Sequence, residues 1–152
     1  MTRVEILLNG MPMSLDAPAD GLLLDALRAE GALEVKEGCG VGVCGLCAVL
    51  LDDLPISACL YLTGLAAGAE VWTAKGLLQK DVSLARAFVE HEAMQCGICT
   101  PGQVVAAAAL RRAREEGHVE EVSLWMSGNL CRCTGYQSIL AAVEQYVAQD
   151  EA

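Results

Sequence analysis

Hydrophobic and polar positions alternate near the start of the chain in the manner of β-strands. Residues 4–8 and 12–15 form two short apolar runs on either side of Asn9-Gly10, a strong sequence signal for a β-hairpin. Residues 20–30 then place leucines at helical spacing, and Gly31 follows as a typical helix end. This stretch is therefore predicted to be a hairpin followed by a helix.

Two further apolar runs complete the first half of the chain. Residues 46–51 and 55–57 lie on either side of Asp52-Asp53, which predicts two strands joined by a turn. Residues 70–73 predict one last short strand. The first half is thus expected to be mixed α/β.

The second half has the 3.6-residue periodicity of amphipathic helices. Four helices are predicted, over residues 82–94, 101–116, 119–127 and 136–148. The border between the two halves is expected near residues 74–81, which gives domains over residues 1–76 and 77–152 and an α+β fold. Domains of roughly 75 residues bury thin cores and usually need a metal or disulfides for stability.

Charge and composition narrow the range of partners. The chain of 152 residues has a net charge of −10, which argues against binding to nucleic acids and anionic membranes. Its opening lacks the apolar core of a signal peptide. The longest apolar run, residues 104–110, is too short to span a bilayer, and we expect a cytoplasmic protein.

Eight cysteines are the main chemical feature of the chain. In a reducing compartment they are more consistent with metal binding than with disulfides. They fall into two sets of four, which are Cys39, Cys44, Cys47 and Cys59 in the first half, and Cys96, Cys99, Cys131 and Cys133 in the second.

The first set has the spacing C-x4-C-x2-C with a distant fourth cysteine, as in plant-type ferredoxins that bind a [2Fe–2S] cluster. Gly38, Gly40, Gly42 and Gly45 interleave its cysteines, which would let backbone N–H groups approach the sulfurs. Structural zinc is the alternative, but zinc sites favour two separate cysteine pairs.

The second set consists of two pairs, Cys96-x2-Cys99 and Cys131-x-Cys133. Each pair precedes a predicted capping box, with Thr100 and Gln103 in one and Thr134 and Gln137 in the other. Two helix hairpins related by a pseudo-twofold would then bring four sulfurs together beside helix N-termini, which favour negative charge. Spacing alone leaves zinc and an iron–sulfur cluster both open.

Three longer motifs make a family resemblance specific. They are Glu37-Gly38-Cys39 with Cys44-Gly45-Leu46-Cys47, then Gln95-Cys96-Gly97-Ile98-Cys99-Thr100-Pro101-Gly102, then Ser127-Gly128-Asn129-Leu130-Cys131-Arg132-Cys133-Thr134-Gly135-Tyr136. From about residue 3 to residue 147, the chain resembles the small iron–sulfur subunit of the molybdenum hydroxylases, the xanthine dehydrogenase and aldehyde oxidoreductase family.

The resemblance implies an N-terminal β-grasp, ferredoxin-like domain and a C-terminal four-helix bundle with pseudo-twofold symmetry, each binding one [2Fe–2S] cluster through one cysteine set. It also implies a heterotrimer with a large molybdopterin subunit and a medium FAD subunit. Electrons would pass from molybdenum through the helical-domain cluster and the plant-type cluster to FAD or another acceptor in a partner subunit. Gln95 and Cys133 match family positions that hydrogen-bond the pterin.

Departures from the family pattern occur at Ala48, Lys75 and Gln103, where Thr, an acidic residue and Met are usual. None of them is an expected ligand. Two other interpretations of the chain remain, namely a free-standing two-cluster electron carrier and a zinc-stapled interaction module. No catalytic triad or carboxylate pair is apparent, so we expect no substrate chemistry in this chain.

Overall fold

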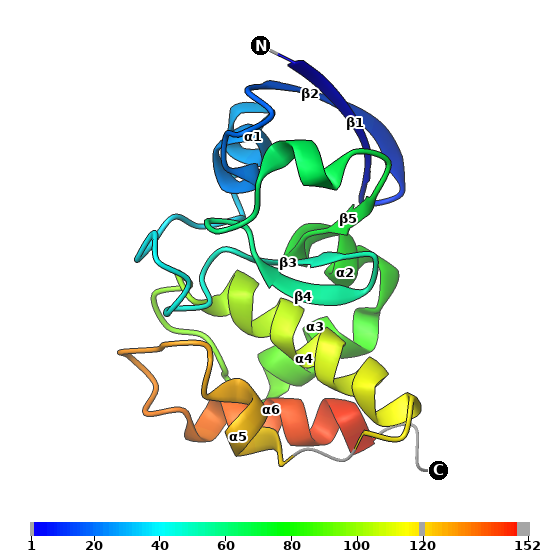
Figure 1. The fold of residues 1–152 in the computed structure, drawn as a ribbon. Coiled ribbons are helices and arrows are strands. Elements are labelled where there is room, and N and C mark those ends of the chain that lie inside the picture. Colours follow the sequence, from blue (N-terminus) through cyan, green and yellow to red (C-terminus); the bar gives the residue numbers. More distant parts are fainter. Residues whose placement is uncertain (1, 119–120, 149–152) are drawn as a thin grey trace.

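The computed structural model of the chain describes residues 2–118 and 121–148. Five strands lie mainly in the upper part of Figure 1 and the larger helices in the lower part. The strands are β1 (Thr2–Leu8), β2 (Met11–Ala17), β3 (Ala48–Leu51), β4 (Leu54–Ser57) and β5 (Glu70–Trp72). The helices are α1 (Leu23–Ala29), α2 (Ala74–Lys80), α3 (Val82–Glu90), α4 (Thr100–Glu115), α5 (Val122–Met126) and α6 (Gln137–Ala148), with a 3-10 turn over Thr63–Ala66. The predicted α+β class is confirmed.

A single mixed sheet holds the strands in the order β2-β1-β5-β3-β4. Strand β1 pairs antiparallel with β2 and parallel with β5, whereas β3 pairs antiparallel with both β4 and β5. Asn9 and Gly10 have φ values of 53° and 79°, as a two-residue type I′ hairpin requires. Asp52 and Asp53 also have positive φ, so both predicted hairpins are confirmed.

The sheet separates two hydrophobic cores. Val4, Ile6 and Leu8 alternate along β1 and pack with the leucines of α1 on one side. Strand β3 sends Val49 into that core and the next residue, Leu50, into the core formed by the helices. The helical half is therefore built directly onto the second face of the sheet.

Helix α4 lies at the centre of the second core. Its buried residues pack against α2, α3, α5 and α6, and also against β3. The many alanines of α4 permit this close packing from several sides. None of the helices among residues 2–118 and 121–148 is both long and apolar enough to cross a membrane. The pseudo-twofold relation between the helices stays a prediction.

Several element boundaries differ from the predicted ones. Helix α1 begins at Leu23, three residues later than expected, and the expected border region forms α2, which sequence periodicity missed. Helix α3 ends at Glu90 because Glu92 adopts a left-handed φ of 50°, and Ala93 N–H donates to the Phe88 carbonyl in a helix-ending turn.

The last two helices are shorter than predicted. Of the helix expected over residues 119–127, α5 covers Val122–Met126, and residues 119–120 lie outside the described part. Helix α6 begins at Gln137 because Tyr136 has a φ of 69°, outside the helical region.

Candidate metal centres

A loop that runs from α1 to β3 holds three cysteines of the first set, Cys39, Cys44 and Cys47. Val41 and Val43 N–H groups donate to the Cys39 sulfur at 3.4 and 3.3 Å, and the Cys39 N–H donates to the Cys44 sulfur at 3.4 Å. Gly40, Gly42 and Gly45 have φ values of 66°, 73° and 71°. Positive φ turns the amides inward, so these three glycines act as the sequence pattern predicted, whereas Gly38 does not have a positive φ.

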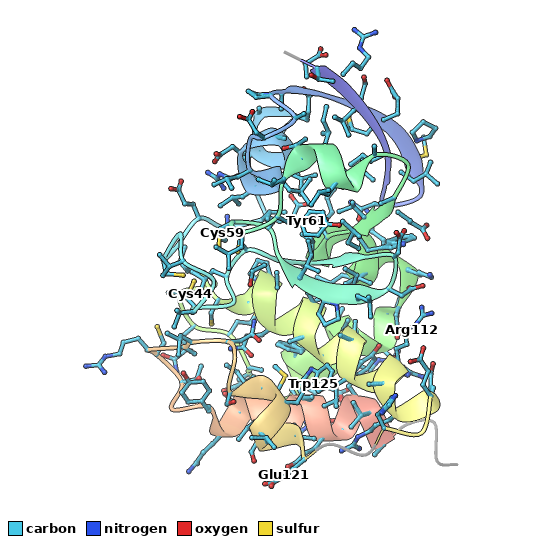
Figure 2. All side chains as sticks on the ribbon, viewed as in Figure 1. Cys44, Cys59, Tyr61, Arg112, Glu121 and Trp125 are labelled. Carbon is cyan, nitrogen blue, oxygen red and sulfur yellow. The ribbon has the colours of Figure 1, made fainter. Side chains whose placement is uncertain are left out.

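The β3–β4 hairpin brings the fourth cysteine to this loop. Cys47 directly precedes β3 and Cys59 follows β4, and Ala48 pairs with Ser57 in the hairpin register. Ala58 N–H then donates to the Cys47 carbonyl at 3.3 Å. Figure 2 shows Cys44 and Cys59 on the same side of the molecule. The hairpin thus joins Cys59 to a loop that ends twelve residues earlier in the sequence.

All four cysteines of the second set line one pocket of about 440 Å³. The Cys96 and Cys133 sulfurs lie 3.4 Å apart, and the Thr134 hydroxyl lies 3.2 Å from the Cys131 sulfur. Cys131 N–H donates to the Tyr136 hydroxyl at 2.9 Å. The fold therefore brings together two pairs that lie over thirty residues apart.

The predicted capping boxes are wrong. Helix α4 begins at Thr100, with Cys99 at its N-cap position and no side-chain cap, and Gln103 is buried and donates to the Asn129 carbonyl instead. Thr134 accepts from the Tyr136 N–H at 3.1 Å in the loop before α6. Gln103 is directed away from its own helix end by a tertiary contact with the loop before Cys131, whereas Thr134 keeps local partners, the Tyr136 N–H and the Cys131 sulfur.

Local hydrogen bonds favour the thiolate at some cysteines. N–H groups, that of Val41 foremost, lower the pKa of the Cys39 thiol to about 6. Burial opposes the charge on Cys131, but the Thr134 hydroxyl and nearby N–H groups outweigh it and lower the pKa to about 7. Because the thiolate is the form that binds metal, these two sites are prepared for ligation.

Burial has the opposite effect at other cysteines of the two sets. Desolvation raises the pKa of Cys47 to about 11 and that of Cys99 to about 12. Each of these thiols has a neighbouring cysteine, Cys59 and Cys131 respectively, whose charge adds to the shift. Such thiols release their protons when a metal binds, and the positive metal then compensates for the lost solvation.

Each cysteine set supplies four sulfurs, the number that a two-iron cluster takes as ligands. Among the described residues, no three Cys, His, Asp or Glu side chains converge as ligands of one metal ion. A [2Fe–2S] cluster needs four cysteines shared between two irons, so its sulfurs need not meet at one point. Donated N–H groups at anionic sulfurs are the environment that such a cluster requires.

The two sites touch each other through the backbone. Leu130 N–H donates to the Cys44 carbonyl at 2.9 Å, and the Asn129 side chain donates to the Gly45 carbonyl at 3.0 Å. All three cysteine loops lie on the same side of the molecule, in cyan, yellow-green and orange in Figure 1. The sequence showed no signal for this junction, because its partners are about 85 residues apart.

Gln95 and Cys133 both have exposed side chains beside the second pocket. Cys133 lines that pocket directly, and Gln95 precedes Cys96, another of its lining residues. Tyr136 and Leu46 also line it, although sequence reasoning had not placed them at the site. The CRCTGY motif could have pointed to Tyr136, whereas Leu46 belongs to the motif of the first set and nothing in the sequence linked it to the second site.

Two family models match the chain. The model described as a 2Fe-2S iron-sulfur cluster binding domain matches residues 6–65, and the one described as a [2Fe-2S] binding domain matches residues 73–144. The chain is 43% identical to the xanthine dehydrogenase iron-sulfur-binding subunit of Escherichia coli O157:H7, over 92% of this chain and 91% of the relative. It is 41% identical to the nicotinate dehydrogenase small FeS subunit of Eubacterium barkeri, over 95% and 94%.

Solved structures agree with these matches. Quinoline 2-oxidoreductase from Pseudomonas putida 86 includes a chain that superimposes with a TM-score of 0.85 and 37% identity, over 97% of this chain and 94% of that one. The aldehyde oxidoreductase from Desulfovibrio gigas gives a TM-score of 0.88 and 34% identity over 99% of this chain, but only 17% of that longer chain. The same fold thus occurs both in a separate chain and as part of a larger one.

Proposed function

Because this chain belongs to the small iron–sulfur subunits of the molybdenum hydroxylases, we propose that electrons enter it at the second cysteine set and leave from the first. The chain is an electron-transfer subunit of an oxidoreductase complex, and it carries two [2Fe–2S] clusters, one for each family domain. The contact between the Cys44 and Leu130 backbones, which links the two sites, is the observation that carries the proposed path.

The proposed ligands of one cluster are Cys39, Cys44, Cys47 and Cys59, in a domain over residues 1–76. Those of the other are Cys96, Cys99, Cys131 and Cys133, in a domain over residues 77–152. The N–H groups at the Cys39 and Cys44 sulfurs support the first assignment. The shared pocket, together with the Thr134 hydroxyl beside Cys131, supports the second.

The proposed partners are a large molybdopterin subunit and a medium FAD subunit or another electron acceptor. When bound in its own subunit, the molybdenum centre supplies the oxidation of the organic substrate and hence the electrons. Gln95 and Cys133 would face the pterin, and their exposure beside the second pocket supports that role. The exposed Cys39 marks the corresponding outer edge of the first site.

We also propose a cytoplasmic location, because eight free thiols need a reducing compartment until the clusters are inserted.

Quantitative EPR on the dithionite-reduced native protein tests the proposal. Two S = 1/2 signals with about two spins per chain are expected, because each complete four-cysteine site holds one [2Fe–2S] cluster. Molybdenum in the same purified sample would support the subunit role. Two spins without any molybdenum or flavin partner would favour a free electron carrier. One spin, or zinc in place of iron, would contradict the proposed path.

A further inference from the structure

Gln103 is an unusual residue for its position in the fold. It lies in the first turn of α4, its side chain is 0% exposed, and the residues around it belong to the helical core. Its Nε2 donates to the Asn129 carbonyl at 3.0 Å, but its Oε1 accepts no hydrogen bond in the described structure. A buried acceptor without a partner lowers stability, so its presence needs an explanation.

The residue that Gln103 contacts holds the loop of the other cluster site. The Asn129 side chain donates to the Gly45 carbonyl at 3.0 Å, and the next residue, Leu130, donates its N–H to the Cys44 carbonyl at 2.9 Å. Gly102, beside Gln103, lies so close to the Gly45 carbonyl that a side chain there would overlap it. The buried Gln103 amide thus holds the segment before Cys131, and that segment in turn holds the loop around Cys44 and Gly45.

We propose that Gln103 is a positioning residue for electron transfer between the two clusters. By fixing the Asn129 backbone, it sets the placement of the Cys44–Cys47 loop relative to the Cys131–Cys133 loop. The step that it supports moves one electron, so one cluster is oxidised as the other is reduced, and no bond or proton changes place. This inference rests on the ligand sets proposed above.

A role in stability and a role in positioning favour different side chains at residue 103. An apolar side chain of similar length, such as Met, would fill the same volume and remove the unpaired acceptor, which favours the folded state. It would also remove the donor that holds Asn129. A role in stability alone would therefore be better met by an apolar residue, such as the Met that is usual in the family, whereas the amide of this chain also holds the Asn129 backbone.

The test compares Gln103→Met with Val105→Ala, a matched control that is equally buried in α4 but whose side chain cannot hydrogen-bond to Asn129 or Gly45. Each full-length variant is purified in its native complex and fully reduced. Three quantities are measured, namely the number of spins, the spin–spin splitting between the two EPR signals, and the two reduction potentials. Thermal unfolding is recorded for the same samples.

For Gln103→Met we expect about two spins per chain as in the wild type, an unfolding temperature that is unchanged or higher, a changed splitting and a shifted potential of at least one cluster. For Val105→Ala we expect a lower unfolding temperature with unchanged splitting and potentials. Asn129→Ala removes the Gly45 contact from the other end of the link and should change the splitting in the same direction as Gln103→Met.

An unchanged splitting and unchanged potentials in both Gln103→Met and Asn129→Ala would overturn the inference while leaving the proposed function intact. Loss of one cluster from Gln103→Met would also overturn it, since the residue would then be needed for assembly rather than positioning. Fewer than two spins in the wild type would instead contradict the proposed function, and this inference would fail with it.

Discussion

The two cysteine sites stabilise negative charge on their sulfurs in different ways. The first is built mainly by one loop, in which three cysteines lie within nine residues and glycines turn N–H groups toward the sulfurs. The second is built by tertiary structure, which brings two distant cysteine pairs to one pocket and uses the Thr134 hydroxyl beside a sulfur. The comparison shows that negative sulfurs can be stabilised by local backbone geometry or by the packing of separate segments.

The difference extends to the protonation of the thiols. The exposed Cys39 owes its lowered pKa to backbone N–H groups of its own loop, whereas Cys131 needs a hydroxyl to overcome its burial. Each site also contains a thiol with a raised pKa, Cys47 in one and Cys99 in the other. Both sites therefore combine one cysteine that ionises readily with one that releases its proton on metal binding.

Removing one proposed ligand from either site gives the largest expected effect and tests the two sites separately. Cys47→Ala should abolish one EPR signal and Cys99→Ala the other, each reducing iron from about four to about two atoms per chain, because a three-cysteine site no longer holds a stable cluster. Spin quantitation and iron analysis provide the measurement.

Each cysteine variant serves as the control for the other. If both variants lost the same signal, the division of the eight cysteines into two independent sites would be wrong. Loss of both signals from Cys99→Ala, with the full chain still folded, would mean that the first site cannot form without the second.

The junction between the two sites should be sensitive to added volume. Gly102→Ala places a methyl group against the Gly45 carbonyl, which is backbone and cannot rotate away. Overpacking costs about 1–3 kcal/mol, here about 3 kcal/mol because the contact is with rigid backbone, and the better helix propensity of Ala recovers about 1 kcal/mol. We therefore expect a net loss of about 2 kcal/mol and an unfolding temperature lower by about 4–8 °C.

Gly128→Ala is the matched control for the junction. Gly128 has no positive φ, and a methyl group there meets no atom within 4 Å. Its unfolding temperature should stay within about 2 °C of the wild type, since surface substitutions usually change stability by less than 0.5 kcal/mol. Equal stability of Gly102→Ala and Gly128→Ala would mean that the two halves are not held in the close contact described above.

A smaller effect is expected at Asp81, which stabilises only the helical half. Its carboxylate accepts hydrogen bonds from the Ser83 N–H at 2.9 Å, from the Tyr146 hydroxyl at 2.9 Å and from Arg111 at 3.1 Å. Burial acts to raise the pKa of Asp81, but the hydrogen bonds from Ser83 and Tyr146 outweigh it, and the pKa lies below its ordinary value.

A lowered pKa in the folded state means that the Asp81 carboxylate stabilises the fold above its unfolded pKa of about 4 and loses this effect as the pH falls further. Asp81→Asn keeps a good helix cap but loses the charge, so we expect a loss of about 1 kcal/mol at pH 7. The difference in unfolding free energy from the wild type should shrink below pH 4. A difference that stayed constant to pH 3 would contradict this account.

The sequence by itself predicted the strand pairs around Asn9-Gly10 and Asp52-Asp53, because hairpin turns depend on residues that are adjacent in the chain. It also predicted the glycine-assisted loop around Cys39 and Cys44 for the same reason. The division of eight cysteines into two sets followed from spacing, and the family followed from three local motifs. These features need no knowledge of distant contacts.

Only the tertiary structure decided what Gln103 does. Local rules made Gln103 part of a helix cap, yet its burial against the loop before Cys131 directs it to Asn129, whereas Thr134 keeps local partners in the Cys131 loop. The contact of Cys44 with Leu130 was equally beyond prediction. Packing the helical half onto the sheet brings these groups together, and a single sequence carries no record of which distant polar groups will share one buried space.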